Sequence, residues 1–213
     1  MAIILSLCGY PGFGKTTQSK KIKSYYGNQA VILSVPKLLA YDVESISVLT
    51  EDEVNLIHKN ANNANKSMER GVLVDAFIDE LLYRAVARFM YKKDVIILDG
   101  SPRDLNSFKL FMNLSDTESS NRIIFIYLKT EGNEIDLSIN RQIKRAKKEG
   151  TQAFTNLEQF EQKTHVFDNF TKSNFRELLY QNHKKVEYYE IICVQEENIV
   201  FDNIIKHIVI PVK

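Results

Sequence analysis

Features that mark several specialised classes of protein are scarce in this sequence of 213 residues. There are only two cysteines, Cys8 and Cys193, each inside an apolar run, and they predict reduced core thiols rather than a disulfide. The four histidines are scattered, so no Cys/His cluster indicates a zinc site. The 28 basic and 27 acidic residues leave a formal net charge of +1, which gives no reason to expect a nucleic-acid or membrane partner.

Long apolar runs are also missing. No run approaches the roughly 20 residues that a membrane-spanning helix needs. The opening residues, MAIILSLCGYPG, lack the basic segment of a signal peptide and lead directly into a glycine-rich loop. We therefore expect a cytoplasmic protein with a single domain over residues 1–213, long enough to bury a substantial core.

What the sequence does contain is an alternation of short apolar runs and longer amphipathic stretches. Continuous apolar runs are typical of strands buried on both faces, as in a parallel sheet. The runs are Ile3–Leu7, Ala30–Leu33, Val95–Leu98, Ile123–Leu128 and Glu190–Val194. Helical spacing links the apolar residues of three other stretches, which begin at Val74, Ile135 and Phe160 and end near Phe89, Ala146 and Leu178. This alternation predicts βαβ units and an open α/β sheet.

The strongest motif is a glycine-rich loop. The chain has eight glycines, and Gly9, Gly12 and Gly14 belong to one segment, Gly9-Tyr10-Pro11-Gly12-Phe13-Gly14-Lys15-Thr16. This segment matches the P-loop pattern G-x-x-x-x-G-K-[ST], between an expected strand and an expected helix. Such a loop points successive backbone N–H groups at one anion. Lys15 would add a charge at the β- and γ-phosphates, and the Thr16 hydroxyl a ligand for Mg²⁺.

A second element fits the first. The run Val95-Ile96-Ile97-Leu98 ends in Asp99, the form of a Walker B strand. Ligands of open α/β sheets bind beyond the carboxyl ends of the strands, so Asp99 would lie near the P-loop and could hold Mg²⁺ through water. An acid at a strand end more often caps the next helix, but the P-loop favours the functional interpretation.

These residues resemble the adenylate kinases and their nucleoside monophosphate kinase relatives. The loop is similar to the family's G-x-P-G-x-G-K-G-T-Q, and Asp99-Gly100-Ser101-Pro102-Arg103 to its D-G-F-P-R. The resemblance implies a three-layer P-loop NTPase fold with a five-stranded parallel sheet. It also implies an insertion over the acceptor nucleotide, at about 36–72, and a short lid over ATP, at about 141–157.

The resemblance also implies roles for individual residues. Lys15, Arg103 and Arg145 would be catalytic: Lys15 would stabilise the transferring group, Arg103 would hold the acceptor phosphate, and Arg145 would contact the phosphates in transfer. The expected ATP-binding residues are Gly9, Pro11, Gly12, Phe13, Gly14, Lys15, Thr16, Thr17 and Arg141. Arg141, Arg145 and Lys148 share one helical face, which is also the pattern of a solvated basic face. Phosphoryl transfer depends mostly on positioning and positive charge, so no catalytic His or Cys is required.

The sequence departs from this family on the acceptor side. The family's acceptor segment reads S-T-G-D-x-L-R, but here Ala40 stands where its arginine is expected and Val35 where its threonine is. Ser107 replaces the glutamine that reads adenine. We therefore expect a non-standard acceptor, bound by Arg103 together with Lys37, Asn106 and Ser107. A lysine offers only a point charge in place of an arginine's bidentate fork.

The residues expected to bind ATP match the family's pattern more fully than those expected to bind the acceptor. Thr16, where most members of the family have glycine, restores the hydroxyl for direct contact with Mg²⁺. The lid is thinner, since residues 151–155 carry no charge, although Lys163 lies about where a further arginine is expected.

The leading hypothesis is an ATP- and Mg²⁺-dependent kinase for a nucleoside monophosphate or a related small acceptor. Two alternatives stay open: a kinase for a nucleoside or another small metabolite, and a nucleotide-binding regulatory protein with little turnover. The expected partners are ATP and a nucleotide-like acceptor, with no nucleic acid and no membrane. The chain does not reveal its oligomeric state, and a monomer is the working expectation.

Overall fold

The sheet at the centre of the molecule contains five strands, all parallel. The computed structural model describes residues 1–69, 73–116, 120–149, 157–181 and 184–209. The strands are β1 (Ile3–Gly9), β2 (Ala30–Leu33), β3 (Val95–Asp99), β4 (Arg122–Lys129) and β5 (Glu187–Ile192), in the spatial order β2-β3-β1-β4-β5. This confirms the α/β class, the three-layer P-loop NTPase-like fold and the five-stranded parallel sheet that the sequence predicted.

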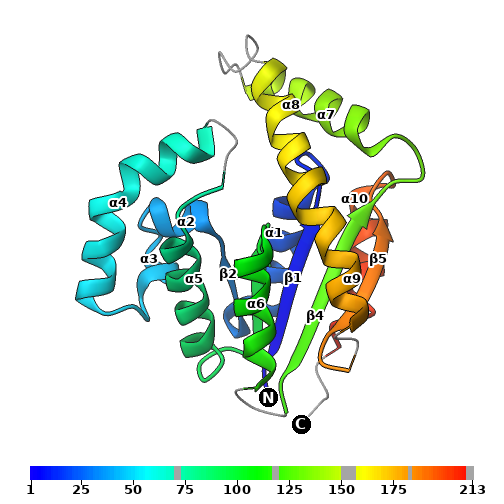
Figure 1. The fold of residues 1–213 in the computed structure, drawn as a ribbon. Coiled ribbons are helices and arrows are strands. Elements are labelled where there is room, and N and C mark those ends of the chain that lie inside the picture. The colour runs from blue at the N-terminus through cyan, green and yellow to red at the C-terminus, as the bar shows by residue number, and fades with distance from the viewer. Residues whose placement is uncertain (70–72, 117–119, 150–156, 182–183, 210–213) are drawn as a thin grey trace.

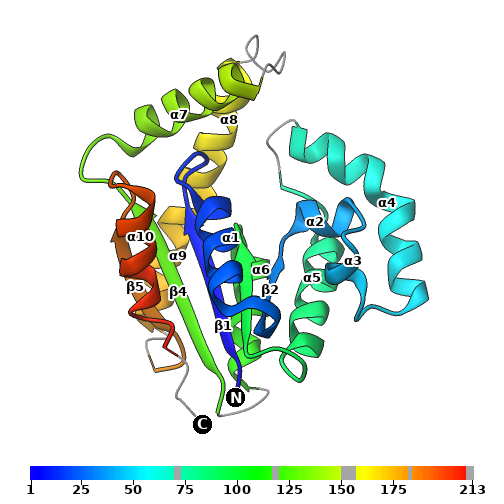
Figure 2. The ribbon, with the colours of Figure 1, turned by 180° about the vertical axis from the view of Figure 1, so that it is seen from behind.

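Helices cover both faces of the sheet, because each central strand is buried on both sides. Successive residues of β1 contribute to two separate core clusters, Ile3, Leu5 and Leu7 to one, Ile4 and Cys8 to the other. On one face lie α5 (Ala76–Phe89), α6 (Leu105–Asn113) and α9 (Ser173–Gln181), seen in front in Figure 1. On the other face lie α1 (Lys15–Tyr26) and α10 (Glu197–Ile205), which Figure 2 shows from behind.

Two helical arms flank the sheet, one beside its β2 edge and the other beyond the carboxyl ends of β1 and β4 (Figure 1). One arm contains α2 (Val35–Leu39), α3 (Val43–Ile46) and α4 (Glu51–Glu69). The other contains α7 (Glu134–Glu149) and α8 (Leu157–Val166). The insertion and lid expected over 36–72 and 141–157 fall on these arms, although residues 70–72 and 150–156 lie outside the described part of the chain.

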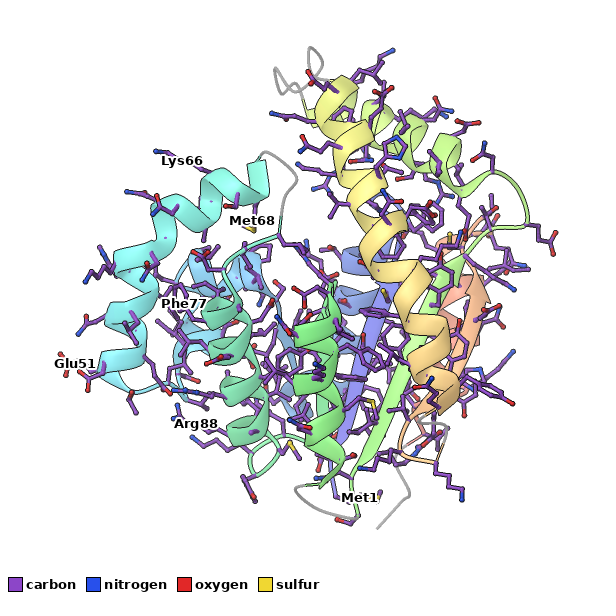
Figure 3. The ribbon with its side chains drawn as sticks, viewed as in Figure 1. Met1, Glu51, Lys66, Met68, Phe77 and Arg88 are labelled. Carbon is purple, nitrogen blue, oxygen red and sulfur yellow. The ribbon has the colours of Figure 1, made fainter. Side chains whose placement is uncertain are left out.

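The first arm is fixed to the body by ionic contacts. Glu53 of α4 is buried, and its carboxylate accepts hydrogen bonds from Arg88 of α5, with Nη2–Oε1 at 3.0 Å. Arg84 Nη1 lies 3.4 Å from the same carboxylate. The hydrogen bonds from Arg88 lower the pKa of Glu53 to about 2, so the carboxylate stays charged at neutral pH. In Figure 3 Arg88 lies at the foot of α5, near the start of α4 at Glu51.

The last third of the chain departs from the simple pattern. The strand expected at Glu190–Val194 is observed at Glu187–Ile192, and this edge strand begins with half-buried glutamates and tyrosines instead of an apolar run. The stripe from Phe160 to Leu178 is a helix interrupted by a π-helical segment, η4 (Phe167–Lys172), between α8 and α9. Short 3₁₀ turns, η1 (Gly27–Gln29) and η2 (Leu114–Asp116), complete the described elements. In the described part of the chain, no helix is both long and apolar enough to cross a membrane.

Candidate nucleotide site

The glycine-rich loop joins the end of β1 to the start of α1, as the motif requires. Gly14 is the N-cap of α1, and its φ of 84° belongs to the left-handed region that favours glycine. The loop therefore delivers its backbone N–H groups to the positive end of a twelve-residue helix. This is the geometry of an anion-binding site.

Lys15 lies inside this loop and holds its backbone. Its ammonium donates hydrogen bonds to the carbonyl oxygens of Gly9, at 2.7 Å, and Tyr10, at 2.9 Å. Burial lowers the pKa of Lys15 from its usual value, since water is excluded from the charged group. A phosphate group would restore the favourable environment for that charge.

Thr16 and Asp99 meet where the sequence predicted a metal site. The Thr16 hydroxyl donates to Asp99 Oδ2 at 2.7 Å, so a hydroxyl oxygen and a carboxylate oxygen lie side by side at the mouth of the loop. Hard oxygen ligands of this kind suit Mg²⁺, which protein sites hold through one or two such groups together with phosphates and water. The residues present therefore fit a magnesium ion delivered with a nucleotide.

A cavity of about 410 Å³ opens beside the loop, between the two arms. Among the described residues, four cationic side chains line it: Lys15, Arg103, Arg145 and Lys163. Its other described lining residues are mostly apolar or backbone: Cys8, Gly9, Pro11, Pro36, Met68, Leu73, Gly100, Pro102, Val166, Phe167 and Thr171. Met68 lies at the end of α4 (Figure 3), so both arms contribute to the cavity wall. A positive centre with apolar walls suits a ligand that carries both phosphate and an apolar ring.

Arg103 is placed next to the P-loop by the turn that follows β3. Its Nε donates to the carbonyl of Gly100 at 2.7 Å, and a side chain at Gly100 would meet Arg103 Nη2 and Lys15 Cε, each at 3.6 Å. Both cationic side chains therefore lie against Gly100 at the cavity wall. All three predicted catalytic residues line this cavity: Lys15, Arg103 and, from α7, Arg145.

The predicted donor residues lie in or beside the glycine-rich loop. Arg141 of α7 lies against the loop: a side chain at Gly12 would meet its Cβ at 3.0 Å, and its guanidinium lies 5.9 Å from the centre of the Phe13 ring. Phe13 itself is buried, so only its backbone is available to a nucleotide. Pro11 lines the cavity, and Thr17 lies half-buried in the first turn of α1.

The acceptor side is assembled only in part. Of the described residues that line the cavity, none is Lys37, Asn106 or Ser107. The Lys37 ammonium lies 3.2 Å from the Asp42 carboxylate. Ser107 is fully buried, and together with Asp104 it forms the capping box at the start of α6. Asn106 is exposed in the first turn of the same helix. Arg103 is the predicted acceptor residue that reaches the cavity.

Sequence reasoning missed the contribution of the η4 segment. Phe167 and Thr171 of this segment line the cavity. A second contact that the sequence did not indicate comes from α7, where the Ser138 hydroxyl donates to the carbonyl of Pro11 at 2.7 Å. The stripe of phenylalanines indicated a buried helix but carried no sign that it would lie against a loop more than 150 positions earlier. Cys8 also reaches the cavity, but burial raises the pKa of its thiol to about 12, so it is no nucleophile at neutral pH.

A buried carboxylate lies near Arg103 and gives a pH-dependent prediction. Asp79 of α5 is 4% exposed, and its Oδ1 has no hydrogen-bond partner among the described residues. Burial, followed by the charge of Asp104, raises the pKa of Asp79 from 3.8 to about 6, while Arg103 opposes the shift. Because the folded state holds this proton more tightly than the unfolded state, ionisation of Asp79 removes stability as the pH rises from about 4 to 6.

Asp79→Asn should therefore become more stable relative to wild type as the pH rises. The advantage of the variant should grow by about 2 kcal/mol between roughly pH 4.5 and pH 7.5, because only the wild type loses the proton. Urea unfolding of both proteins at the two pH values measures the change. An equal difference at both values would contradict the raised pKa.

The parallel sheet, the loop before α1 and the Thr16–Asp99 pair together define a P-loop NTPase-like protein. A family model described as "Chromatin associated protein KTI12" matches residues 1–209, and the chain belongs to this family. The family comparison thus supports the P-loop kinase-like class that the sequence indicated, and does not show membership of the adenylate kinase family. Comparison with curated proteins finds no match.

Proposed function

We propose that the protein binds ATP with Mg²⁺ and transfers the γ-phosphoryl group to a small, phosphate-bearing acceptor. The observation that carries this proposal is the position of Arg103. It lies beside Lys15 at the wall of a cavity that two further cations, Arg145 and Lys163, also line. The P-loop alone would account for ATP binding, whereas a second phosphate site next to it supports transfer between two phosphate-bearing molecules.

Each residue has a defined task in this mechanism. Lys15 and the backbone N–H groups of the loop hold the β- and γ-phosphates of ATP. Thr16 and Asp99 would hold Mg²⁺, which offsets phosphate charge when bound. Arg103 orients the acceptor phosphate, and Arg145 and Lys163 add positive charge where negative charge spreads during transfer.

The apolar part of the cavity supports a nucleotide-like acceptor. Pro36, Met68 and Leu73 come from the first arm, and Val166 and Phe167 from the second. These surfaces can pack against a base or another flat ring, while polar groups that would read a particular base are few. We therefore leave the identity of the base open within this class.

Formation of ADP from ATP and Mg²⁺ tests the proposal. The panel contains ribo- and deoxyribonucleoside monophosphates and the corresponding free nucleosides. The proposal expects turnover with at least one monophosphate and little with its nucleoside. Turnover with a nucleoside alone would contradict the acceptor role of Arg103.

Arg103→Ala should raise the KM for the phosphorylated acceptor by roughly tenfold to a hundredfold, because it removes a charge-assisted hydrogen bond in a partly desolvated site. The KM for ATP should change much less. Lys109→Ala, at an exposed position of α6, is a matched control for loss of one cation. A variant in which only ATP binding weakens would place Arg103 on the donor side.

A second candidate is a regulatory protein that binds nucleotide with little turnover. The family's printed description names association with chromatin and no reaction. Ala40 stands where an arginine was expected, at the C-cap of α2, and Lys37 is paired with Asp42, so the acceptor side has fewer cations than the resemblance implied. Binding of ATP without ADP formation across the panel would favour this candidate.

A further inference from the structure

Tyr10, the first variable residue of the P-loop, packs its side chain against η4. The side chain is fully buried, and its ring packs against Phe167 with centroids 4.6 Å apart. Its hydroxyl donates to the carboxylate of Asp168, and the ammonium of Lys172 lies 3.2 Å from the same hydroxyl. Phe167, Asp168 and Lys172 all belong to η4, which lies about 160 positions later in the chain. Nothing in the mechanism above uses these contacts.

The same η4 segment also contacts the backbone of Arg103, the proposed acceptor residue. Thr171 is buried, and its hydroxyl donates to the backbone carbonyl of Arg103 at 2.6 Å. Phe167 and Thr171 line the cavity as well. One six-residue segment therefore contacts the donor loop, the loop of the acceptor arginine and the space between them.

The segment is anchored to the start of α7, next to the end of β4. Lys172 forms an ion pair with Glu134 at 2.7 Å, and the hydroxyl of Tyr127 in β4 lies 3.2 Å from the same carboxylate. At its other end η4 continues into α8, which carries Lys163 into the cavity lining, and Figure 1 shows α8 and α9 running on from one another beside β1 and β4. A π-helical turn inside a helix is frequently found at functional sites.

Lys15 connects this arrangement to the state of the phosphate site. Its ammonium holds the carbonyls of Gly9 and Tyr10. A phosphate that binds to Lys15 competes for the same three donors, so occupancy of the site changes the hold on the backbone of Tyr10. Burial and the contact with Asp168 raise the pKa of Tyr10 to about 12, which keeps its hydroxyl a donor over the working pH range.

We propose that Tyr10 is a positioning residue whose hydroxyl links the P-loop to η4, so that binding of the ATP phosphates sets the position of η4 and, through Thr171, of Arg103. This inference rests on the proposed function and adds the contact by which the donor site acts on the acceptor site. It gives the buried tyrosine a role, whereas a loop that only binds phosphate does not require a tyrosine at this position.

Hydrogen–deuterium exchange of the full-length chain, with and without MgATP, tests the link. In the wild type, MgATP should slow exchange by at least about threefold in peptides that cover residues 9–17 and also in those that cover 160–172 and 100–108. In Tyr10→Phe the slowing should persist in 9–17 and largely disappear in the two distant segments. Tyr25→Phe, on the exposed side of α1, is the matched control and should behave as the wild type.

Asp168→Ala removes the same contact from the other side and should give the pattern of Tyr10→Phe even if that variant folds poorly. Thr171→Val should lose the slowing in 100–108 and keep it in 160–172. Turnover adds a second readout: Tyr10→Phe should lower kcat by about tenfold and change the KM for ATP by less than about threefold.

The outcomes separate this inference from the proposed function. Equal protection patterns in the wild type, Tyr10→Phe and Asp168→Ala would overturn the role of Tyr10, as would a wild type in which MgATP protects residues 9–17 alone. A wild type with the spread pattern but no phosphoryl transfer to any acceptor would overturn the proposed function and leave the link supported. No MgATP-dependent protection of 9–17 would overturn both.

Discussion

Lys15→Ala should reduce ATP-dependent turnover by at least about a hundredfold, the scale seen when one preorganised charge is removed from a reacting centre. The ammonium is the positive group that the loop places nearest to the expected phosphates, and it also holds the carbonyls of Gly9 and Tyr10. Its removal therefore takes away charge stabilisation and lets the loop backbone relax. Steady-state ADP formation measures the effect.

The same substitution should leave the fold intact, with a free energy of unfolding within about 1 kcal/mol of wild type, because two opposing effects nearly cancel. The variant loses two hydrogen bonds, but it also loses a charge whose burial is unfavourable, as its lowered pKa shows. Lys20→Ala, at an exposed position of the same helix, is the matched control and should keep full turnover. Normal activity in Lys15→Ala would rule out the P-loop assignment.

Gly9→Ala should be the most destabilising single-methyl change in the loop, at about 3 kcal/mol. Gly9 is the last residue of β1 and has a φ of 145°, and a Cβ there would meet the carbonyl oxygen of Leu128 at 2.7 Å. Leu128 belongs to the neighbouring strand β4, whose register with β1 is fixed by parallel pairing. The clash involves backbone on both sides, so the sheet would have to open or the loop would have to move.

Gly14→Ala is the matched control, because it adds the same methyl group at a positive φ without a close contact. Gly14 has a φ of 84°, but a Cβ there would have no heavy atom within 4 Å among its described surroundings. Its substitution should cost only the left-handed backbone penalty of about 1 to 2 kcal/mol. Urea unfolding of the two variants compares them, and a Gly9→Ala protein as stable as Gly14→Ala would contradict the close approach of β1 and β4.

The parts of the fold that the sequence predicted well are those set by local composition. Val95–Leu98 and Ala30–Leu33 are uninterrupted apolar runs, and the structure places both in buried strands, the second at one edge of the sheet. A parallel strand that helices cover on both faces must be apolar on both faces. The edge strand β5 was displaced by three residues at its start. Its first four residues are half-buried glutamates and tyrosines, so the uninterrupted apolar run that predicts a buried strand is missing there.

In the candidate site, too, the residues within short local motifs could be predicted and the contacts between distant segments could not. The P-loop and Asp99 are contiguous motifs with a fixed place relative to strands, and the contact between Thr16 and Asp99 follows from that place. The offset of Ser107 from Arg103 predicts an acceptor contact. In the structure the Ser107 hydroxyl accepts from the backbone N–H groups of Arg103 and Asp104, and Asp104 Oδ1 accepts from the N–H of Ser107 in the capping box of α6. The contact between Tyr10 and η4 has no signal in either local sequence, since it joins segments about 160 positions apart.

Transfer of labelled phosphate from [γ-³²P]ATP is the most direct test of the central proposal. Wild-type protein and Lys15→Ala are incubated with labelled ATP, Mg²⁺ and each monophosphate of the panel, and the products are separated. Label should appear in an acceptor diphosphate with the wild type and should be absent from it with Lys15→Ala. Label that stays in ATP or appears only as inorganic phosphate, from a protein that binds MgATP, would contradict phosphoryl transfer to a phosphate-bearing acceptor.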